Sequence, residues 1–296
     1  MQYSAIGLGE VLWDILPSGK QLGGAPANFA YHVNALSGDK LTSYIVSSVG
    51  KDGLGDDILK ILRERSLGVD NIFVDAEHET GVVEVEIDSN GTPSYSIKEG
   101  VAWDYIPNIS EILAQSSSIV CFGSLAQRFP VSKNSIQSFI ANTPRESLRI
   151  FDINLRQNYY NTDVINDSLE LANVLKINDD ELVEVAKLFG LRGSEEDVLE
   201  KLVGNYSLML GVLTKGEKGS VLLNGEGVSS HSGYPTKMKD SVGAGDSFTA
   251  AVALGLLRGM DLESINDYAN RVASFVCSQE GATPILPKEL TGLFDD

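Results

Sequence analysis

The strongest chemical signal in the chain is a loop of small residues that leads into a carboxylate, in the stretch DSVGAGDSFTAAVA at residues 240–253. Gly243, Ala244 and Gly245 stand directly before Asp246, and an apolar helical run follows. The first N–H groups of a helix have no partner within the helix, so such a start attracts anions. Three N–H groups, at Ala244, Gly245 and Asp246, could hold a phosphoryl group while Asp246 accepts a proton. An ordinary N-terminal cap would explain the aspartate equally well.

A second helix start that carries glycines reads GGAPANFA, at residues 23–30. Gly23 and Gly24 allow the backbone to approach a ligand closely, and Pro26 suits the first turn of a helix. Asn28, on that turn, can both donate and accept a hydrogen bond with a hydroxyl group. Many helices begin in this way, so this stretch alone does not define a function.

Two further stretches suit a nucleotide. Asn178 and Glu181, in NDDE, follow a predicted strand and open a helix, at the sheet edge where α/β proteins bind ligands. The two residues share a helix face and could hold Mg²⁺ through water molecules, although a plain helix cap is the alternative. The stretch TKGEKG, at residues 214–219, joins two strands. It is either a simple hairpin or a loop that offers Thr214 and backbone groups to phosphates.

Several common motifs fail. The spacing of Gly211 and Gly216 fits a P-loop, but Glu217-Lys218 follows where Lys-Ser/Thr is required. A dinucleotide fingerprint after the first strand would need its third glycine at Leu12, which argues against an NAD-dependent dehydrogenase. The sequence contains no H-E-x-x-H, paired C-x-x-C or G-x-S-x-G motif, and its three histidines are scattered.

The composition is that of a soluble globular protein with a large core, since 43% of the 296 residues are hydrophobic and 22% are charged. A net charge of −18 argues against nucleic acid and anionic membranes as partners. The start, MQYSAIGLGEVLWDI, lacks the features of a signal peptide, and no run reaches the ~20 apolar residues of a membrane span. We therefore expect a cytoplasmic protein, with Cys121 and Cys277 as buried free thiols.

Short β-branched runs alternate with helical stretches, which predicts an α/β fold with a mostly parallel central sheet and helices on both faces. The expected strands are 4–9, 41–50, 117–123, 148–154, 172–178 and 207–214, and the expected helices are 26–37, 54–66, 132–142, 179–189, 194–203, 246–258 and 262–279.

Two segments, 10–22 and 80–103, break this alternation. The alternating run VVEVEID and the turn Ser89-Asn90-Gly91 predict a hairpin, so we expect a small antiparallel β lid that stands off the sheet. An edge extension without a role is the alternative. The whole chain, 1–296, is expected to be a single domain with this lid.

Together these motifs resemble the ribokinase-like sugar kinases of the PfkB family. GGAPANFAYHVNALSG and DSVGAGDSFTAAVA resemble its N-terminal and C-terminal signatures, NDDE its N-x-x-E motif, and TKGEKG its T-x-G-x-x-G loop. The matches keep the family order from residue 7 to beyond residue 280. The resemblance implies a ribokinase-like fold with a β lid over the sugar, and transfer of the γ-phosphate of ATP, with Mg²⁺, to a sugar hydroxyl.

The resemblance also implies roles for particular residues. Asp246 matches the catalytic base, and Gly243, Ala244 and Gly245 match the anion hole for the γ-phosphate. The remaining matches are Asp14, Gly24 and Asn28 at the sugar, Asn178 and Glu181 in the Mg²⁺ and phosphate motif, Thr214, Gly216 and Gly219 in the nucleotide loop, and Asn270 beside the adenine. Asp240 and Val242, with the turn at 281–283, lie where many members bind a monovalent cation such as K⁺.

The sugar is less well defined. GEVLWDILP, KEGVAWDYI, FGSLAQR and DINLRQNYY resemble the fructokinase branch, so D-fructose is the expected substrate. Arg156 could bind a sugar hydroxyl or an anionic group, or form a surface ion pair. If it binds a carboxylate, 2-keto-3-deoxygluconate is the substrate to consider, and ribose and nucleosides are further alternatives. Trp103 either stacks on the sugar or fills the base of the lid.

A protein that senses a sugar or nucleotide on the same fold is the alternative outside catalysis. The intact base, anion hole and N-x-x-E motif argue against it, because a binding protein does not need the base. An exposed apolar face in VVEVEID would suit a homodimer formed through the lid.

Overall fold

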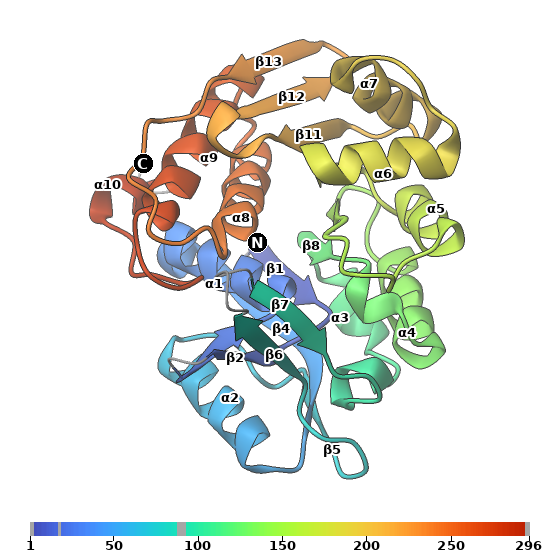
Figure 1. Ribbon diagram of the computed structural model, residues 1–296, viewed down its shortest axis with the longest axis vertical. Coiled ribbons are helices and arrows are strands. Elements are labelled where there is room, and N and C mark those ends of the chain that lie inside the picture. The colour runs from blue at the N-terminus through green and yellow to red at the C-terminus, as the bar shows by residue number, and fades with distance from the viewer. Residues whose placement is uncertain (1–2, 17–18, 88–92, 294–296) are drawn as a thin grey trace.

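The computed structural model describes residues 3–16, 19–87 and 93–293, which form a sheet of nine strands and a sheet of four. The nine strands lie in the order β13-β12-β11-β10-β9-β8-β1-β4-β5 (Figure 1). Their bounds are β1 (Tyr3–Leu8), β4 (Leu41–Gly50), β5 (Ile72–Asp75), β8 (Ile119–Phe122), β9 (Leu148–Asp152), β10 (Val174–Asn178), β11 (Leu210–Thr214), β12 (Ser220–Asn224) and β13 (Gly227–His231). Neighbours from β5 to β11 run parallel, whereas β11/β12 and β12/β13 are antiparallel. The predicted mostly parallel sheet is confirmed.

Helices cover both faces of this sheet, as predicted (Figure 1). One face packs against α1, α8 and α9, which contribute Phe29, Phe248 and Val272 to a continuous apolar core. The other face packs against α4 to α7. The bounds are α1 (Ala25–Ser37), α2 (Gly53–Glu64), α3 (Glu111–Gln115), α4 (Pro130–Ala141), α5 (Thr162–Leu171), α6 (Asp179–Phe189), α7 (Glu195–Asn205), α8 (Ala244–Leu257), α9 (Leu262–Cys277) and α10 (Lys288–Thr291). Short 3₁₀ turns are η1 (Gly38–Lys40), η2 (Ala102–Tyr105), η3 (Leu125–Gln127) and η4 (Gly216–Lys218).

A small separate sheet forms in the two segments expected to make the lid, and it is built from β2 (Leu12–Leu16), β3 (Gly19–Gly23), β6 (Val82–Ile87) and β7 (Pro93–Ile97). Its order is β3-β2-β6-β7, so two antiparallel hairpins are joined by a central pair, β2 and β6, that runs parallel. The turn predicted at residues 89–91 lies outside the described residues. In Figure 1 the strands β6 and β7 are drawn in front of β4, and they belong to a sheet separate from it.

The structure also contains elements that the sequence patterns did not predict, namely α5, β5, β13 and the short helices α3 and α10. The first of these is capped by Asn161, whose side chain accepts a hydrogen bond of 2.9 Å from the N–H of Val164. Both cysteines are free, as expected, although Cys277 is only half-buried. Within the described ranges, none of the helices has the length and apolar character to cross a membrane.

Candidate active site

The site begins at the N-terminus of α8, where the chain turns sharply into the helix. Gly243 has a φ of 78°, in the left-handed region that favours glycine. A Cβ atom there would lie 2.3 Å from the carbonyl oxygen of Ala282, so no side chain fits. The helix starts at Ala244, two residues earlier than predicted, which places Asp246 in its first turn. Three N–H groups were expected to be free here. That of Ala244 instead donates a weak hydrogen bond, with its nitrogen 3.3 Å from the carbonyl oxygen of Ser241.

Asp246 meets Asn28 across the interface of two helices. The amide nitrogen of Asn28 donates a hydrogen bond of 2.8 Å to Oδ2 of Asp246, although 218 positions separate them in the chain. Burial, together with the charge of Asp152, raises the pKa of Asp246 to about 6, against the opposing effects of Asn28, Lys176 and Arg156. The two glycine-bearing helix starts therefore come together at one place, and the carboxylate they share is still ionised at neutral pH.

The lid contributes a second carboxylate through Asp14, on β2. Burial raises the pKa of Asp14 to about 6, and the positive charge of Arg156 opposes this. A Cβ at Gly23 would lie 2.2 Å from Oδ2 of Asp14, and one at Gly24, whose φ is 108°, would lie 2.4 Å from the oxygen of Glu10. The Gly-Gly pair thus lets the chain pass close to both acidic residues.

Glu10 is a member of this group that the sequence analysis missed. It is 2% exposed, and its Oε2 has no hydrogen-bond partner among the residues that the structure describes. Burial is the main cause that raises its pKa to about 7; the charge of Asp246 adds to this, and that of Arg156 opposes it. The available signal was its position directly behind the first strand, where the carboxyl edge of the sheet begins.

Arg156 and Trp103 occupy different environments. Arg156 is exposed, donates a hydrogen bond of 3.0 Å to the oxygen of Leu155, and acts electrostatically on Glu10, Asp14 and Asp246. Trp103 is 1% exposed, and the guanidinium carbon of Arg128 lies 4.0 Å from its ring centroid. This packing favours the interpretation that Trp103 fills the base of the lid.

The N-x-x-E motif forms a capping box at the start of α6. Glu181 N–H donates to Oδ1 of Asn178 over 2.8 Å, and Asn178 N–H donates to Oε2 of Glu181 over 2.9 Å. The other oxygen of Glu181 accepts from the N–H of Leu155 over 3.0 Å. Because both carboxylate oxygens already accept backbone bonds, Glu181 fits Mg²⁺ through water better than through direct coordination.

The nucleotide loop lies between β11 and β12. Thr214 ends β11, and the turn after it uses Gly216 and Gly219, with φ of 54° and 85°. A Cβ at Gly219 would lie 1.9 Å from the oxygen of His231, so the neighbouring strand requires glycine here. Asn270 is nearby in the fold but buried, and its amide donates to Ser220 over 2.7 Å and to the carbonyl oxygen of Asn266 over 2.8 Å. The bond to Ser220 ties α9 to β12.

Asp240 links the two loops that were expected to hold a monovalent cation. Its Oδ1 accepts from the N–H of Val242 over 3.0 Å, and its Oδ2 accepts from the N–H of Gly281 over 3.1 Å. Val242 itself is exposed. Within the described residues, no group of three or more His, Cys, Asp or Glu side chains could hold a metal ion.

The sequence pattern that defines the pfkB family of carbohydrate kinases matches residues 18–289, and so covers both glycine-bearing helix starts. The chain belongs to this family. Its fold agrees, since a fructokinase from Xylella fastidiosa and a ribokinase from Thermotoga maritima superpose on the whole chain with TM-scores of 0.85 and 0.81, at 21% and 19% identity. The enzyme is therefore a carbohydrate kinase.

Individual relatives of this carbohydrate kinase are distant. A sugar kinase of Pyrococcus horikoshii is 29% identical over 273 residues, which are 89% of this chain and 83% of the relative. Its structure in complex with ATP superposes with a TM-score of 0.79 at 28% identity, covering 95% of this chain and 94% of that one. A fructokinase of Escherichia coli is 25% identical, covering 95% of each chain. A fructokinase from Xylella fastidiosa with bound ATP has a TM-score of 0.85 at 21% identity, covering 100% of this chain and 99% of that one, which shows the fold alone.

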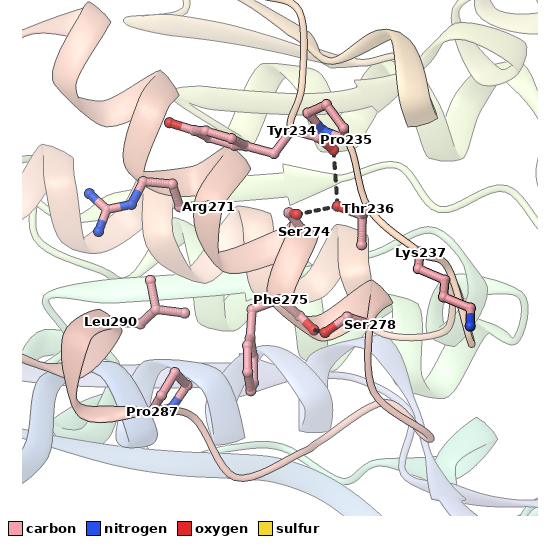
Figure 2. A pocket seen from close by; sticks show the side chains of 10 residues that line it. All are labelled: Tyr234, Pro235, Thr236, Lys237, Arg271, Ser274, Phe275, Ser278, Pro287 and Leu290. Atoms are coloured by element: carbon pink, nitrogen blue, oxygen red, sulfur yellow. Dashed lines mark hydrogen bonds between the residues drawn. The ribbon is translucent and has the colours of Figure 1, made fainter.

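One cavity of the kinase lies away from all of these residues. Figure 2 shows this pocket, of about 530 Å³, between the segment 234–237, the outer face of α9 and the short helix α10. Thr236 closes one side through hydrogen bonds to the carbonyl of Tyr234 and to Ser274. None of the predicted site residues lines it. The chemistry therefore has to be assigned from the geometry around Asp246.

Proposed function

We propose that this carbohydrate kinase transfers the γ-phosphate of ATP to a hydroxyl group of D-fructose. The observation that carries the proposal is the bond between Asn28 and Asp246, which places an ionisable carboxylate, an amide and a helix N-terminus at one point. In-line phosphoryl transfer needs a positioned hydroxyl, a base and charge stabilisation, and little covalent chemistry from the protein.

In the proposed reaction, Asp246 accepts the proton of the attacking hydroxyl as its oxygen forms a bond to the γ-phosphorus and the bond to the bridging oxygen of ADP breaks. The N–H groups of Gly245 and Asp246, with that of Ala244 once its weak bond opens, stabilise the transferring group. Asn28, Gly24 and Asp14 hold the sugar, and the lid excludes water.

The nucleotide side is assigned to the carboxyl edge of β10 and β11. Thr214, Gly216 and Gly219 bind the nucleotide phosphates, with Asn178 beside them. The buried Asn270 stabilises this region through its hydrogen bond to Ser220, which follows the loop. Mg²⁺ bound with ATP supplies neutralisation of the β- and γ-phosphate charge, and Glu181 holds it through water. Asp240 and Val242 are the residues proposed for a monovalent cation.

A second substrate is favoured by one specific observation. The exposed guanidinium of Arg156 acts on three carboxyl groups of the site and has the planar fork that binds a carboxylate in two places. It therefore suits 2-keto-3-deoxygluconate. Fructose is preferred because Glu10, Asp14 and Asp246 together make the site acidic, and a negative substrate is repelled there. Ribose is neutral like fructose, so it is a further candidate substrate.

The test is a coupled assay of ADP release with Mg·ATP and a panel of fructose, ketodeoxygluconate, ribose, adenosine and glucose. The proposal predicts the highest kcat/KM for fructose. A clear preference for ketodeoxygluconate, lost in Arg156→Met, would replace fructose with the sugar acid and assign Arg156 to its carboxylate. No turnover with any sugar would favour the sensing alternative. A homodimer through the lid is a separate prediction, which light scattering of the intact protein checks against the monomer mass of 31.9 kDa.

A further inference from the structure

A buried ion pair lies directly beneath the first turn of α8. Lys176 on β10 and Asp152 on β9 are partners in the parallel register, and Nζ lies 3.0 Å from Oδ1. The residues are 7% and 5% exposed. Burying such a pair costs desolvation free energy that the attraction often does not recover. Its presence at the active-site edge of the sheet therefore requires a reason other than stability.

Both members of the pair reach α8. Thr249, one turn into the helix, has its Oγ1 3.0 Å from Oδ2 of Asp152 and 2.9 Å from the carbonyl oxygen of Gly245. A Cβ built on Gly245 would lie 3.2 Å from Nζ of Lys176. The ammonium group thus lies beside Gly245, and a Cβ at that position would require it to shift by a few tenths of an ångström.

The charges that face Asp246 come from several elements. Asp152 and Glu10 are acidic neighbours, Lys176 and Arg156 are basic ones, Asn28 contributes a neutral amide, and the Cys121 thiol lies beside them on β8. Asp152 and Lys176 act on Asp246 with opposite signs. Burial opposes the charge of Lys176, but the carboxylates of Asp152 and Glu181 outweigh it, so the pKa of Lys176 stays above its ordinary value.

We propose that Lys176 is a positioning residue of the phosphoryl transfer: through Asp152 and Thr249 it fixes the first turn of α8 on the sheet and balances the negative charge around the base. The residue joins the two halves of the site, because it lies two positions before Asn178 on one side and against Gly245 on the other. The inference rests on the proposed role of Asp246 as the base.

The test compares three substitutions in the intact enzyme, each read through the pH dependence of kcat/KM. Lys176→Met removes the positive charge, so the acidic limb of the kcat/KM profile should move to higher pH by about 1 unit. Asp152→Asn removes the negative charge, so this limb should move to lower pH. Thr249→Val removes the hydroxyl without changing charge, so kcat should fall while the limb stays in place.

Lys176→Arg is the conservative control, since it keeps the charge and should leave the limb near its wild-type position. Circular dichroism and thermal unfolding of each variant identify any that do not fold, and Asp152→Asn carries the test if Lys176→Met is among them. If the ion pair is merely structural, the variants should be less stable, and the acidic limb should not shift in opposite directions in Lys176→Met and Asp152→Asn. Shifts of the same sign, or no shift in folded variants, would overturn the proposal.

Asp246→Asn, assayed in parallel, distinguishes failure of the role proposed for Lys176 from failure of the role proposed for Asp246. If it is inactive and the opposite shifts are absent, the inference fails and the proposed base stands. If it keeps wild-type activity, the base assignment fails and the role of Lys176 fails with it.

Discussion

At the scale of single residues, the site is defined by carboxyl groups that burial makes harder to ionise. The pKa values of Asp246 and Asp14 rise to about 6, and that of Glu10 to about 7. Arg156 is the cation that acts on all three. A base with a pKa near the working pH is ionised in most molecules and still accepts a proton well. The environment of Asp246 therefore suits general-base catalysis better than that of an exposed helix cap would.

This environment predicts how activity depends on pH. Asp246 must be ionised to accept a proton, and its pKa is raised, so kcat/KM should fall as the pH drops through about 6. An unshifted aspartate would keep activity down to about pH 4. The measurement is kcat/KM for the preferred sugar across this range, in buffers of constant ionic strength. A profile that stays flat through pH 6 would contradict the assignment.

At the scale of elements, two helix starts bring the chemistry to the sheet edge, and each has a specific local cause. The first turn of α8 depends on a glycine in the left-handed region, and that of α6 on a reciprocal pair of side-chain bonds. Both signals were visible in the sequence, because glycine runs and N-x-x-E spacing are local. The contact of α8 with Asn28 on α1 was not, since it joins residues 218 positions apart.

Gly243→Ala should damage both stability and catalysis. Its φ of 78° and the Ala282 oxygen at 2.3 Å mean that a methyl group must shift the loop. We expect a loss of stability of more than about 1 kcal/mol and a lower kcat. Gly204→Ala, in the exposed last turn of α7 with open space around it, is the matched control and should stabilise the protein by about 0.5–1 kcal/mol with activity unchanged. Equal behaviour of the two variants would argue against a special start for α8.

Glu181→Gln should distinguish a metal-holding residue from a cap. Glutamine can still complete the capping box through its one oxygen, but its NH2 group then faces the N–H of Leu155, so stability should fall by about 1–3 kcal/mol. If Glu181 holds Mg²⁺ through water, the Mg²⁺ concentration for half-maximal rate should rise by about 10–100-fold. Ser194→Ala removes the equivalent cap of α7, a helix that contains none of the proposed site residues, and should cost about 1 kcal/mol without changing the Mg²⁺ dependence. An unchanged Mg²⁺ requirement in Glu181→Gln would leave the residue as a cap.

At the scale of the whole molecule, Arg128 connects the lid to the body. Its guanidinium forms hydrogen bonds of 2.7 and 2.8 Å with Asp104, donates one of 2.6 Å to the oxygen of Lys98 at the end of β7, and stacks on Trp103. It also lies 4.7 Å from the ring centroid of Tyr159, in the segment that carries Arg156. One buried side chain thus contacts the end of β7, Trp103 and the segment that carries Arg156.

Arg128→Met should therefore affect both stability and sugar binding. The change leaves the buried Asp104 unpaired, at a cost of about 3–5 kcal/mol. Denaturant unfolding should show this loss, with part of it restored in the double variant Arg128→Met, Asp104→Asn. In the folded fraction, the KM for the sugar should rise more than the KM for ATP if the lid covers the sugar, as proposed. Equal effects on both substrates would show that Arg128 does not act through the lid.

The sequence alone was sufficient for much of this architecture. Alternating β-branched and helical runs predicted the parallel sheet, and the break at residues 10–22 and 80–103 predicted the lid. The parallel pairing of β2 with β6 could not be predicted, since it joins two distant hairpins. Glu10 and the pair of Lys176 with Asp152 were missed for a related reason: their chemistry comes from burial and from neighbours on other elements, which no local spacing encodes.

The most direct test of the account is the activity of Asp246→Asn. The amide keeps the size of the side chain and can still accept the bond from Asn28, and it removes a carboxylate whose charged form burial disfavours. The variant should fold with a Tm no lower than that of the wild type and still bind ATP. Its kcat for sugar phosphorylation should fall by about 10²–10⁴-fold, the usual contribution of a general base. A folded variant that turns over at the wild-type rate would show that Asp246 is not the base.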